Sequence, residues 1–339
     1  MQKHLQWALL FLVFFYFLKT PQGYAQKNDL EKQIQQSVLN DLIANNRSFT
    51  QEGKVADYIP ELGKANPNDM AIAIVTSNGR IIEAGDTQKT FTIQSISKLI
   101  GLVLAVEDRG EEEVFKRVGY YGTPKPFNSY ADLETHLKPL NPMMNAGAIL
   151  VTSLIKGKGQ EPFERILERI RYITKNNSIQ LNTRVYASEK STGDRNRGIF
   201  YILKNNGWIQ SEEGDEDQLN NYFRQCSIEV SALDLAKIGY FFAHQGTRFD
   251  GDTRFKNPKL TELILAQMLI AGMYDFSGTY ARTVGVPSKS GVGGGITVSV
   301  PHQMGIGTYS PALDEHGNSI AGYHMILELA DELDLSLFR

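Results

Sequence analysis

The sequence predicts an α+β fold in which an antiparallel sheet, built from both ends of the chain, is flanked by helices and carries an inserted helical lobe. Two strand-like runs lie near the start, at residues 70–76 and 80–84, and two more lie near the end, at 296–300 and 304–309. The residues between these pairs of runs are patterned mostly as helices. Strands from the two ends must therefore meet in one sheet, with the helices inserted between them.

The domain organisation follows from this order. We expect a single domain over residues 26–339, with a sheet lobe at about 26–90 and 275–339 and a helical lobe at about 91–274. No internal repeat, low-complexity tract or Pro- or Ser-rich linker divides this span.

Four local patterns define the first half. Apolar residues four apart predict an amphipathic helix over about 29–45. The pair Asn78-Gly79 between the first two strands predicts a two-residue hairpin turn. Residues 99–106 are apolar on most sides and predict a buried helix, and a stripe of apolar residues within 163–173 predicts an amphipathic one.

The second half is read in the same way. Ser231 with Asp234 is typical of a helix N-terminus, and a last helix is expected at about 322–333. We interpret two acidic segments, 111–113 and 212–217, as solvated turns.

The composition excludes several classes of protein. The 339 residues are 42% hydrophobic and 22% charged, which is typical of a folded globular protein. The formal net charge of −3, from 35 basic and 38 acidic residues, does not favour a nucleic-acid partner. The single Cys226 excludes an intramolecular disulfide and a Cys-x-x-Cys motif. The histidines lack zinc-site spacing and no Gly-x-Gly-x-x-Gly follows a strand, so we expect neither metal nor cofactor.

The first 25 residues are typical of a signal peptide. Lys3 precedes an apolar run at 7–18, and a small-x-small pattern ends at Ala25. Twelve apolar residues are too few to span a bilayer comfortably, although an uncleaved anchor is the alternative. We expect an exported protein, periplasmic or secreted, that has no membrane association after cleavage. Because residues 1–25 hold Lys3, Lys19 and no acid, their removal changes the net charge from −3 to −5.

The most informative motif is Ser95-x-x-Lys98, at the start of the apolar helix. A serine hydroxyl is a poor nucleophile until its proton is removed, and a desolvated lysine one turn away can remove it. The alternative is a capping serine followed by a surface lysine, which the apolar surroundings make less natural.

A second motif, Lys289-Ser290-Gly291, accompanies Ser-x-x-Lys in serine acyl-transfer enzymes. On an edge strand beside the nucleophile, the following residue can donate its backbone N–H to an oxyanion. Val292 is the candidate for this donor, together with the N–H of Ser95. A phosphate-binding loop is not indicated, since the glycines precede a strand rather than a helix.

Four further stretches place tyrosine, asparagine or glutamate among small or apolar residues, at 57–62, 141–148, 188–196 and 222–227. Their amides, hydroxyls and carboxylate could pair with the two charged ends of a small zwitterion. Each stretch taken alone is better explained by turns that asparagine caps and by tyrosine packed in the core. Cys226, within the last of them, is interpreted as a buried structural cysteine rather than a nucleophile.

From about Asp57 to Ile296 the chain resembles the serine-dependent glutaminases of the bacterial and animal-kidney type. The resemblance rests on segments in a fixed order: YIPEL, FTIQSISK, NPMMNAGA, SE…DRN, YFRQCS, GMYDFSG and KSGVGGGI. It implies a fold similar to that of the serine β-lactamases and transpeptidases. It also implies hydrolysis of L-glutamine to L-glutamate and ammonia through a γ-glutamyl-serine ester, and assembly into homodimers or homotetramers.

The resemblance implies catalytic roles for four residues. Ser95 would be the nucleophile, Lys98 the group that takes its proton, and Val292 an oxyanion donor. Tyr274 would hydrogen-bond the nucleophile and share proton transfer, and spacing alone does not decide whether Lys98 or Tyr274 is the base. Ser95, Tyr274 and Val292 would also contact the substrate.

The remaining substrate-binding residues follow from the same resemblance. Asn145, Glu189, Asn196 and Tyr222 would hold the α-amino and α-carboxylate groups, and Tyr58 would close the pocket. The predicted signal peptide at residues 1–25 departs from the family pattern, because relatives are often cytoplasmic.

Two other functions remain open. A penicillin-recognising serine hydrolase shares both lysine motifs, but this chain has no Ser-Asp-Asn or Tyr-x-Asn triplet. A non-catalytic amino-acid-binding module would not need an activated hydroxyl, so the pairing of Ser95 with Lys98 argues against it.

Overall fold

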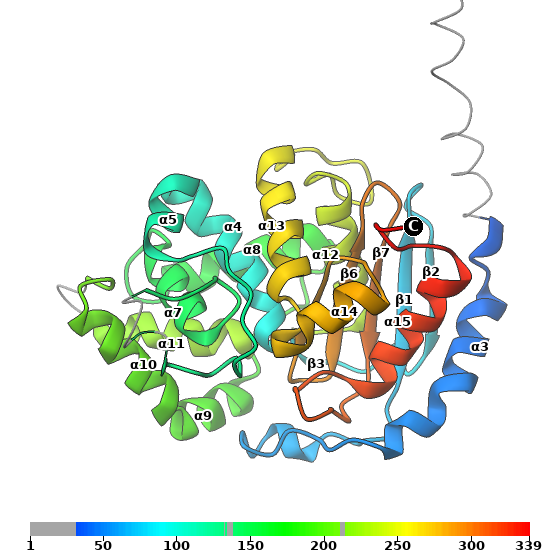
Figure 1. Ribbon diagram of the computed structural model, residues 1–339, viewed down its shortest axis with the longest axis horizontal. Coiled ribbons are helices and arrows are strands. Elements are labelled where there is room, and N and C mark those ends of the chain that lie inside the picture. Colours follow the sequence, from blue (N-terminus) through cyan, green and yellow to red (C-terminus); the bar gives the residue numbers. More distant parts are fainter. Residues whose placement is uncertain (1–31, 132, 134–137, 211–213) are drawn as a thin grey trace, which may run out of the picture. The chain divides into compact units, whose positions relative to one another are not determined.

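The computed structural model describes residues 32–131, 133, 138–210 and 214–339 (Figure 1). The predicted signal peptide lies outside these residues, as does the first part of the helix expected at 29–45. The chain divides into a short unit that ends at Gln35 and a large unit, Gln36–Arg339, which is described here.

The large unit contains a five-stranded sheet with the order β2-β1-β7-β6-β5, in which all neighbours are antiparallel. Its members are β1 (Ala71–Thr76), β2 (Ile81–Gly85), β5 (Ser288–Gly291), β6 (Gly295–Val300) and β7 (Met304–Tyr309). The central strands β1, β6 and β7 are buried along their whole length, so both faces of the sheet are covered. Strands from the two ends of the chain therefore meet in one sheet, where β1 pairs with β7, and the predicted fold class is confirmed.

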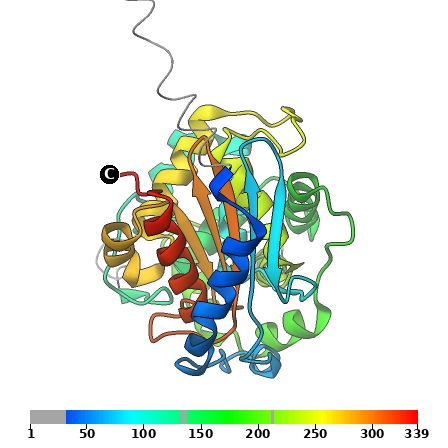
Figure 2. The same ribbon diagram turned by 90° about the vertical axis from the view of Figure 1, so that its right-hand side faces the viewer.

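Helices cover the two faces. On one face, α12 (Ala232–Ala243) packs against β1, β6 and β7. On the other face, α3 (Gln36–Asn46) and α15 (Ile320–Glu332) lie side by side, as Figure 2 shows with the first in blue and the second in red. The predicted cap of α12 is present as a reciprocal pair, in which Ser231 accepts from the N–H of Asp234 and the Asp234 carboxylate accepts from the N–H of Ser231.

The inserted lobe is helical around a buried central helix, α4, which contacts α5, α7, α8 and α13. Its helices are α4 (Ser97–Arg109), α5 (Glu111–Arg117), α7 (Asn145–Leu154), α8 (Glu161–Thr174), α9 (Thr183–Thr192), α10 (Asp194–Asn205), α11 (Asp215–Cys226) and α13 (Pro258–Ala271). Short elements complete the chain: η1 (Arg47–Gln51), η2 (Leu62–Lys64), β3 (Phe91–Thr92), η3 (Gln94–Ile96), β4 (Glu229–Val230), η4 (Tyr274–Phe276) and α14 (Ser277–Thr283). No helix in the described part of the chain is both long and apolar enough to cross a bilayer.

One sequence interpretation was wrong. The acidic residues Glu111, Glu112 and Glu113 form the first turn of α5, and Asp215–Asp217 form the first turn of α11. Carboxylates are favourable at helix N-termini because the helix dipole is positive there. These charges therefore mark where helices begin.

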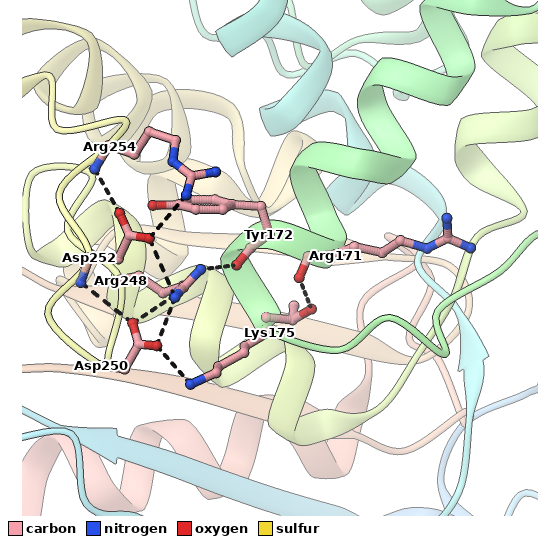
Figure 3. Close-up of polar contacts among 8 residues, drawn as sticks. Arg171, Tyr172, Lys175, Arg248, Asp250, Asp252 and Arg254 are labelled. Atoms are coloured by element: carbon pink, nitrogen blue, oxygen red, sulfur yellow. Dashed lines mark hydrogen bonds and ion pairs between the residues drawn. The ribbon is translucent and has the colours of Figure 1, made fainter.

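An ion cluster ties the connection between α12 and α13 to the C-terminal end of α8 (Figure 3). The guanidinium of Arg248 donates to both carboxylate oxygens of Asp250, at 2.6 and 2.7 Å. The Nζ atom of Lys175 lies 3.0 Å from the same carboxylate, and Arg248 also donates to the carbonyl of Tyr172. These contacts hold the connection between α12 and α13 against α8.

Candidate active site

Ser95 lies in the 3₁₀ turn η3, directly before α4, and Lys98 is the second residue of that helix. Ser95 is 7% exposed. The preceding residue, Gln94, has a φ of +48°, in the left-handed region that residues with a Cβ rarely adopt. The turn that carries the hydroxyl is therefore strained, and such strain is concentrated at functional sites.

Lys98 is buried, with 1% of its surface exposed. Its Nζ donates to the carbonyl of Met143 at 2.9 Å and to Oδ1 of Asn145 at 2.8 Å. Burial lowers the pKa of this amine to about 8, and no carboxylate forms an ion pair with it in the described residues. A substantial fraction of the amine is therefore neutral just above neutral pH.

Tyr274 approaches Ser95 from the opposite side. Its hydroxyl donates to the carbonyl of Ser290 at 3.2 Å and hydrogen-bonds with Ser95. Burial raises the pKa of this phenol, so the group stays protonated and can donate. Tyr274 also has a positive φ, +57°. Two strained residues, Gln94 and Tyr274, thus flank Ser95.

The glycine-rich turn after β5 lies against the strand that precedes η3. A Cβ on Gly293 would be 2.3 Å from the carbonyl oxygen of Thr92, so only glycine permits this approach. β5 is an edge strand of the sheet, as its motif predicted. The N–H groups of Ser95 and Val292 donate to no acceptor within the described residues, although both residues are almost fully buried. Unpaired buried donors are rare, so these two are available to an oxyanion.

A cavity of about 230 Å³ joins these groups to the predicted binding residues. The sequence-predicted residues among those that line it are Tyr58, Ser95, Asn145, Glu189, Asn196, Tyr222 and Val292. They come from η3, α7, α9, α10, α11 and two loops. Lys98 is not on the lining, and neither is Tyr274. Tyr274 lies behind Phe127, with ring centroids 4.8 Å apart, and reaches the site through Ser95.

Glu189 is a buried carboxyl group in the cavity that lacks a full set of hydrogen-bond partners. It is 5% exposed, and its Oε2 atom has no hydrogen-bond partner. Burial raises the pKa of this carboxyl to about 8, while a hydrogen bond with Gln94 and the charge of Lys98 oppose that shift. An ammonium group entering the cavity would supply the missing partner and favour the ionised carboxylate.

Asn145 connects Lys98 to the cavity wall. While its Oδ1 accepts from Lys98, its Nδ2 donates to Oδ1 of Asn196 at 3.0 Å. The amide orientation is therefore set from both sides, with its oxygen toward the amine. Tyr222 is buried at the same end, and Tyr58 is 54% exposed, at the mouth. A second cavity of about 530 Å³ begins there and shares Tyr58, Phe127 and Val292 with the first.

Sequence reasoning missed several lining residues, among them Gln94, Phe127 and Asn128. Gln94 precedes the motif serine and carries no signal apart from that position. Cys226, interpreted as structural, also lines the cavity, and burial raises the pKa of its thiol, which disfavours the nucleophilic thiolate. Within the described residues, no group of three or more His, Cys, Asp or Glu side chains is arranged to hold a metal ion.

Comparison with known proteins yields consistent matches. The family model described as Glutaminase matches residues 53–338. Glutaminase 2 of Clostridium perfringens (strain 13 / Type A) is 52% identical over 303 residues, which cover 88% of this chain and 99% of the relative. A glutaminase of Clostridioides difficile (strain 630) is 46% identical over 308 residues, covering 90% and 99%.

Solved structures agree with these relatives. A structure described as probable glutaminase ybaS has a TM-score of 0.84 and 36% identity, and the match covers 90% of this chain and all of the other. A second is the covalent complex between the Bacillus subtilis glutaminase YbgJ and 5-oxo-L-norleucine, formed by reaction with 6-diazo-5-oxo-L-norleucine. It matches with a TM-score of 0.79 and 36% identity over 88% of this chain and 98% of that one.

Proposed function

This chain belongs to the glutaminase family, and we propose that it hydrolyses L-glutamine to L-glutamate and ammonia through a γ-glutamyl ester on Ser95. The observation that carries this proposal is the buried amine of Lys98, which lies three residues after Ser95, contacts the cavity residue Asn145 and has a pKa lowered to about 8. A penicillin-recognising hydrolase is not favoured, since the relatives that match over nearly their whole length are glutaminases.

Substrate recognition is assigned to the polar side chains that line the cavity together with Ser95. The carboxylate of Glu189, which lacks a partner at Oε2, would bind the α-ammonium group of glutamine. Asn145, Asn196 and Tyr222 would orient the α-carboxylate, and the half-exposed Tyr58 would close the mouth. This arrangement directs the side-chain amide toward Ser95 and the two unpaired N–H groups.

Lys98 is assigned as the group that takes the proton of Ser95. A neutral amine has two N–H bonds and one lone pair. The two N–H bonds are directed to Met143 and Asn145, which leaves the lone pair for the serine hydroxyl. Tyr274, whose pKa is raised by burial, is the poorer base. Its one O–H donates to the carbonyl of Ser290, so its oxygen would accept from the Ser95 hydroxyl and hold that group in place.

The reaction then proceeds in two halves. The Oγ of Ser95 attacks the amide carbon, and the N–H groups of Ser95 and Val292 stabilise the oxyanion. The C–N bond breaks as the leaving nitrogen receives the proton, and ammonia departs. Water, deprotonated by the same amine, attacks the ester, releases glutamate and returns the proton to Ser95.

A trapping experiment tests the nucleophile. Incubation with 6-diazo-5-oxo-L-norleucine, followed by intact mass measurement and peptide mapping, should locate one adduct on Ser95. Ser95→Ala should form no adduct and lose about 10⁴-fold or more in turnover. Cys226→Ala and the exposed control Ser191→Ala should both still be labelled. An adduct on Cys226, or glutaminase turnover in Ser95→Ala, would remove Ser95 from the proposed role.

The leader and the assembly state are proposed on narrower grounds. The charge and apolar pattern of residues 1–25 supports export after cleavage near Ala25. N-terminal sequencing of the protein from fractionated cells tests this proposal, and an intact leader in the membrane fraction contradicts it.

The family resemblance supports a homodimer or homotetramer, which light scattering after gel filtration would distinguish from a monomer.

A further inference from the structure

Lys289 is a buried basic residue for which the proposed reaction has no use. It is 0% exposed, on the edge strand β5, and it forms no ion pair within the described residues. Burying an amine away from water and from carboxylates is costly, so such a group needs a compensating role. Its surroundings indicate that role.

The Nζ of Lys289 joins two segments of the backbone. It donates to the carbonyl of Gly272 at 3.1 Å and to the carbonyl of Ser290 at 2.6 Å. Gly272 ends α13, two residues before Tyr274, while Ser290 provides the carbonyl to which the Tyr274 hydroxyl donates. One amine thus holds both the start of the tyrosine's turn and the acceptor of its phenol.

The two segments also lie as close as backbones allow. The N–H of Ser290 donates to the carbonyl of Gly272 at 3.0 Å, and a Cβ on Gly272 would lie 1.8 Å from the carbonyl oxygen of Ser288. Lys289 spans this junction, and its Nζ lies 4.6 Å from the centroid of the Tyr274 ring. The amine therefore contacts the tyrosine through its ring face and through both of its backbone anchors.

Tyr274 needs such support because its backbone is strained. A non-glycine residue at a φ of +57° is held there only when its surroundings enforce that conformation. Ser277 provides one restraint: its Oγ accepts from the N–H of Met273 and donates to the carbonyl of Tyr274. Lys289 provides a second restraint, through the carbonyls of Gly272 and Ser290.

We infer that Lys289 is a positioning residue, whose amine holds the strained Tyr274 turn against β5 so that the phenol meets Ser95. The inference rests on the proposed function, because it requires that Tyr274 and Ser95 act in that reaction. It assigns no chemical step to Lys289 itself. Lys289 acts only through Tyr274, and this restriction makes the inference testable.

A double-mutant cycle tests it by measuring kcat and KM for glutamine. Lys289→Met keeps the length of the side chain without its amine and should lower kcat about 10²-fold, with KM changed less than threefold. Tyr274→Phe should lower kcat by a similar factor. In the Tyr274→Phe background, Lys289→Met should cost less than threefold, because the group that it positions is already absent.

Two further variants separate positioning from general stability. Ser288→Ala removes a buried hydroxyl from the same strand, one that bonds with Tyr280, and should lower the melting temperature while leaving kcat within threefold. If Lys289→Met does not fold, Lys289→Gln replaces it in the cycle. Its loss in kcat should likewise disappear in the Tyr274→Phe background, and a loss that persists there contradicts the inference.

The outcomes are distinct from a failure of the proposed function. If Tyr274→Phe is impaired while Lys289→Met has wild-type kcat, or if the two losses multiply in the double variant, the inference is wrong and the role of Ser95 is unaffected. If Tyr274→Phe is fully active, both the role of Tyr274 and the inference are wrong. Turnover in Ser95→Ala would instead contradict the proposed function.

Discussion

Gly293→Ala should reduce catalysis without unfolding the protein, because it moves one oxyanion donor. The added methyl would lie 2.3 Å from the carbonyl oxygen of Thr92, whereas such contacts are essentially never shorter than 3.0 Å. The turn that carries Val292 must therefore move away from the strand before Ser95 by roughly 0.7 Å. The φ of Gly293 is not in the left-handed region, so the alanine methyl would displace the turn by steric crowding and not by backbone strain.

The expected loss follows from that displacement. Misplacing a catalytic group by about 1 Å can cost 10²-fold in rate. Loss of one oxyanion donor costs about 10²–10³-fold. We therefore expect kcat to fall by about 10²-fold, equivalent to about 2.7 kcal/mol of transition-state stabilisation. KM should change little, since Val292 is assigned to the oxyanion and other residues are assigned to the α-amino and α-carboxylate groups.

Ammonia release under saturating glutamine measures this effect, with circular dichroism and melting temperature as checks on folding. Gly278→Ala is the matched control, because its Cβ would meet nothing within 4 Å and its site is exposed on α14. Gly278→Ala should retain wild-type kcat. A Gly293→Ala variant with kcat within threefold of wild type would falsify the assignment of Val292 as an oxyanion donor held by this contact.

Three other predictions follow from the charges. Because Lys98 acts in its neutral form and its pKa is lowered to about 8, kcat/KM should rise between pH 6 and 9 with a midpoint near 8; a flat profile contradicts its role as base. Glu189→Gln should raise KM for glutamine about 10²-fold or more, while the exposed Glu164→Gln leaves it unchanged; equal KM values would exclude the ammonium contact. Arg248→Met should lower the free energy of unfolding by about 1–2 kcal/mol in urea titrations, against less than about 0.5 kcal/mol for the more exposed Arg254→Met; no difference between them would mean that the ion cluster does not stabilise the fold.

The sequence by itself predicted many of the elements and the proposed pair of Ser95 and Lys98. Alternating and four-residue apolar patterns depend only on neighbours along the chain, so the hairpin and the capped helix after Ser231 were predictable. The predicted two-residue turn at Asn78-Gly79 was wrong in detail, because the N–H of Gly79 donates to the carbonyl of Thr76 and the turn is centred on Ser77 and Asn78. Ser95 and Lys98 are three residues apart, and this spacing alone placed them together. The acidic segments were misread because a carboxylate run is compatible with both a turn and the first turn of a helix.

Only the tertiary structure decided how these elements make a site. The pKa of Lys98 falls because α7 and the chain before it bury its amine, and Glu189 loses its solvent because distant segments close over it. The positive φ of Gln94 and Tyr274, and the contact of Gly293 with Thr92, arise where separate segments press together. Burial, strain and close approach are properties of segments far apart in the sequence, so no local pattern could report them.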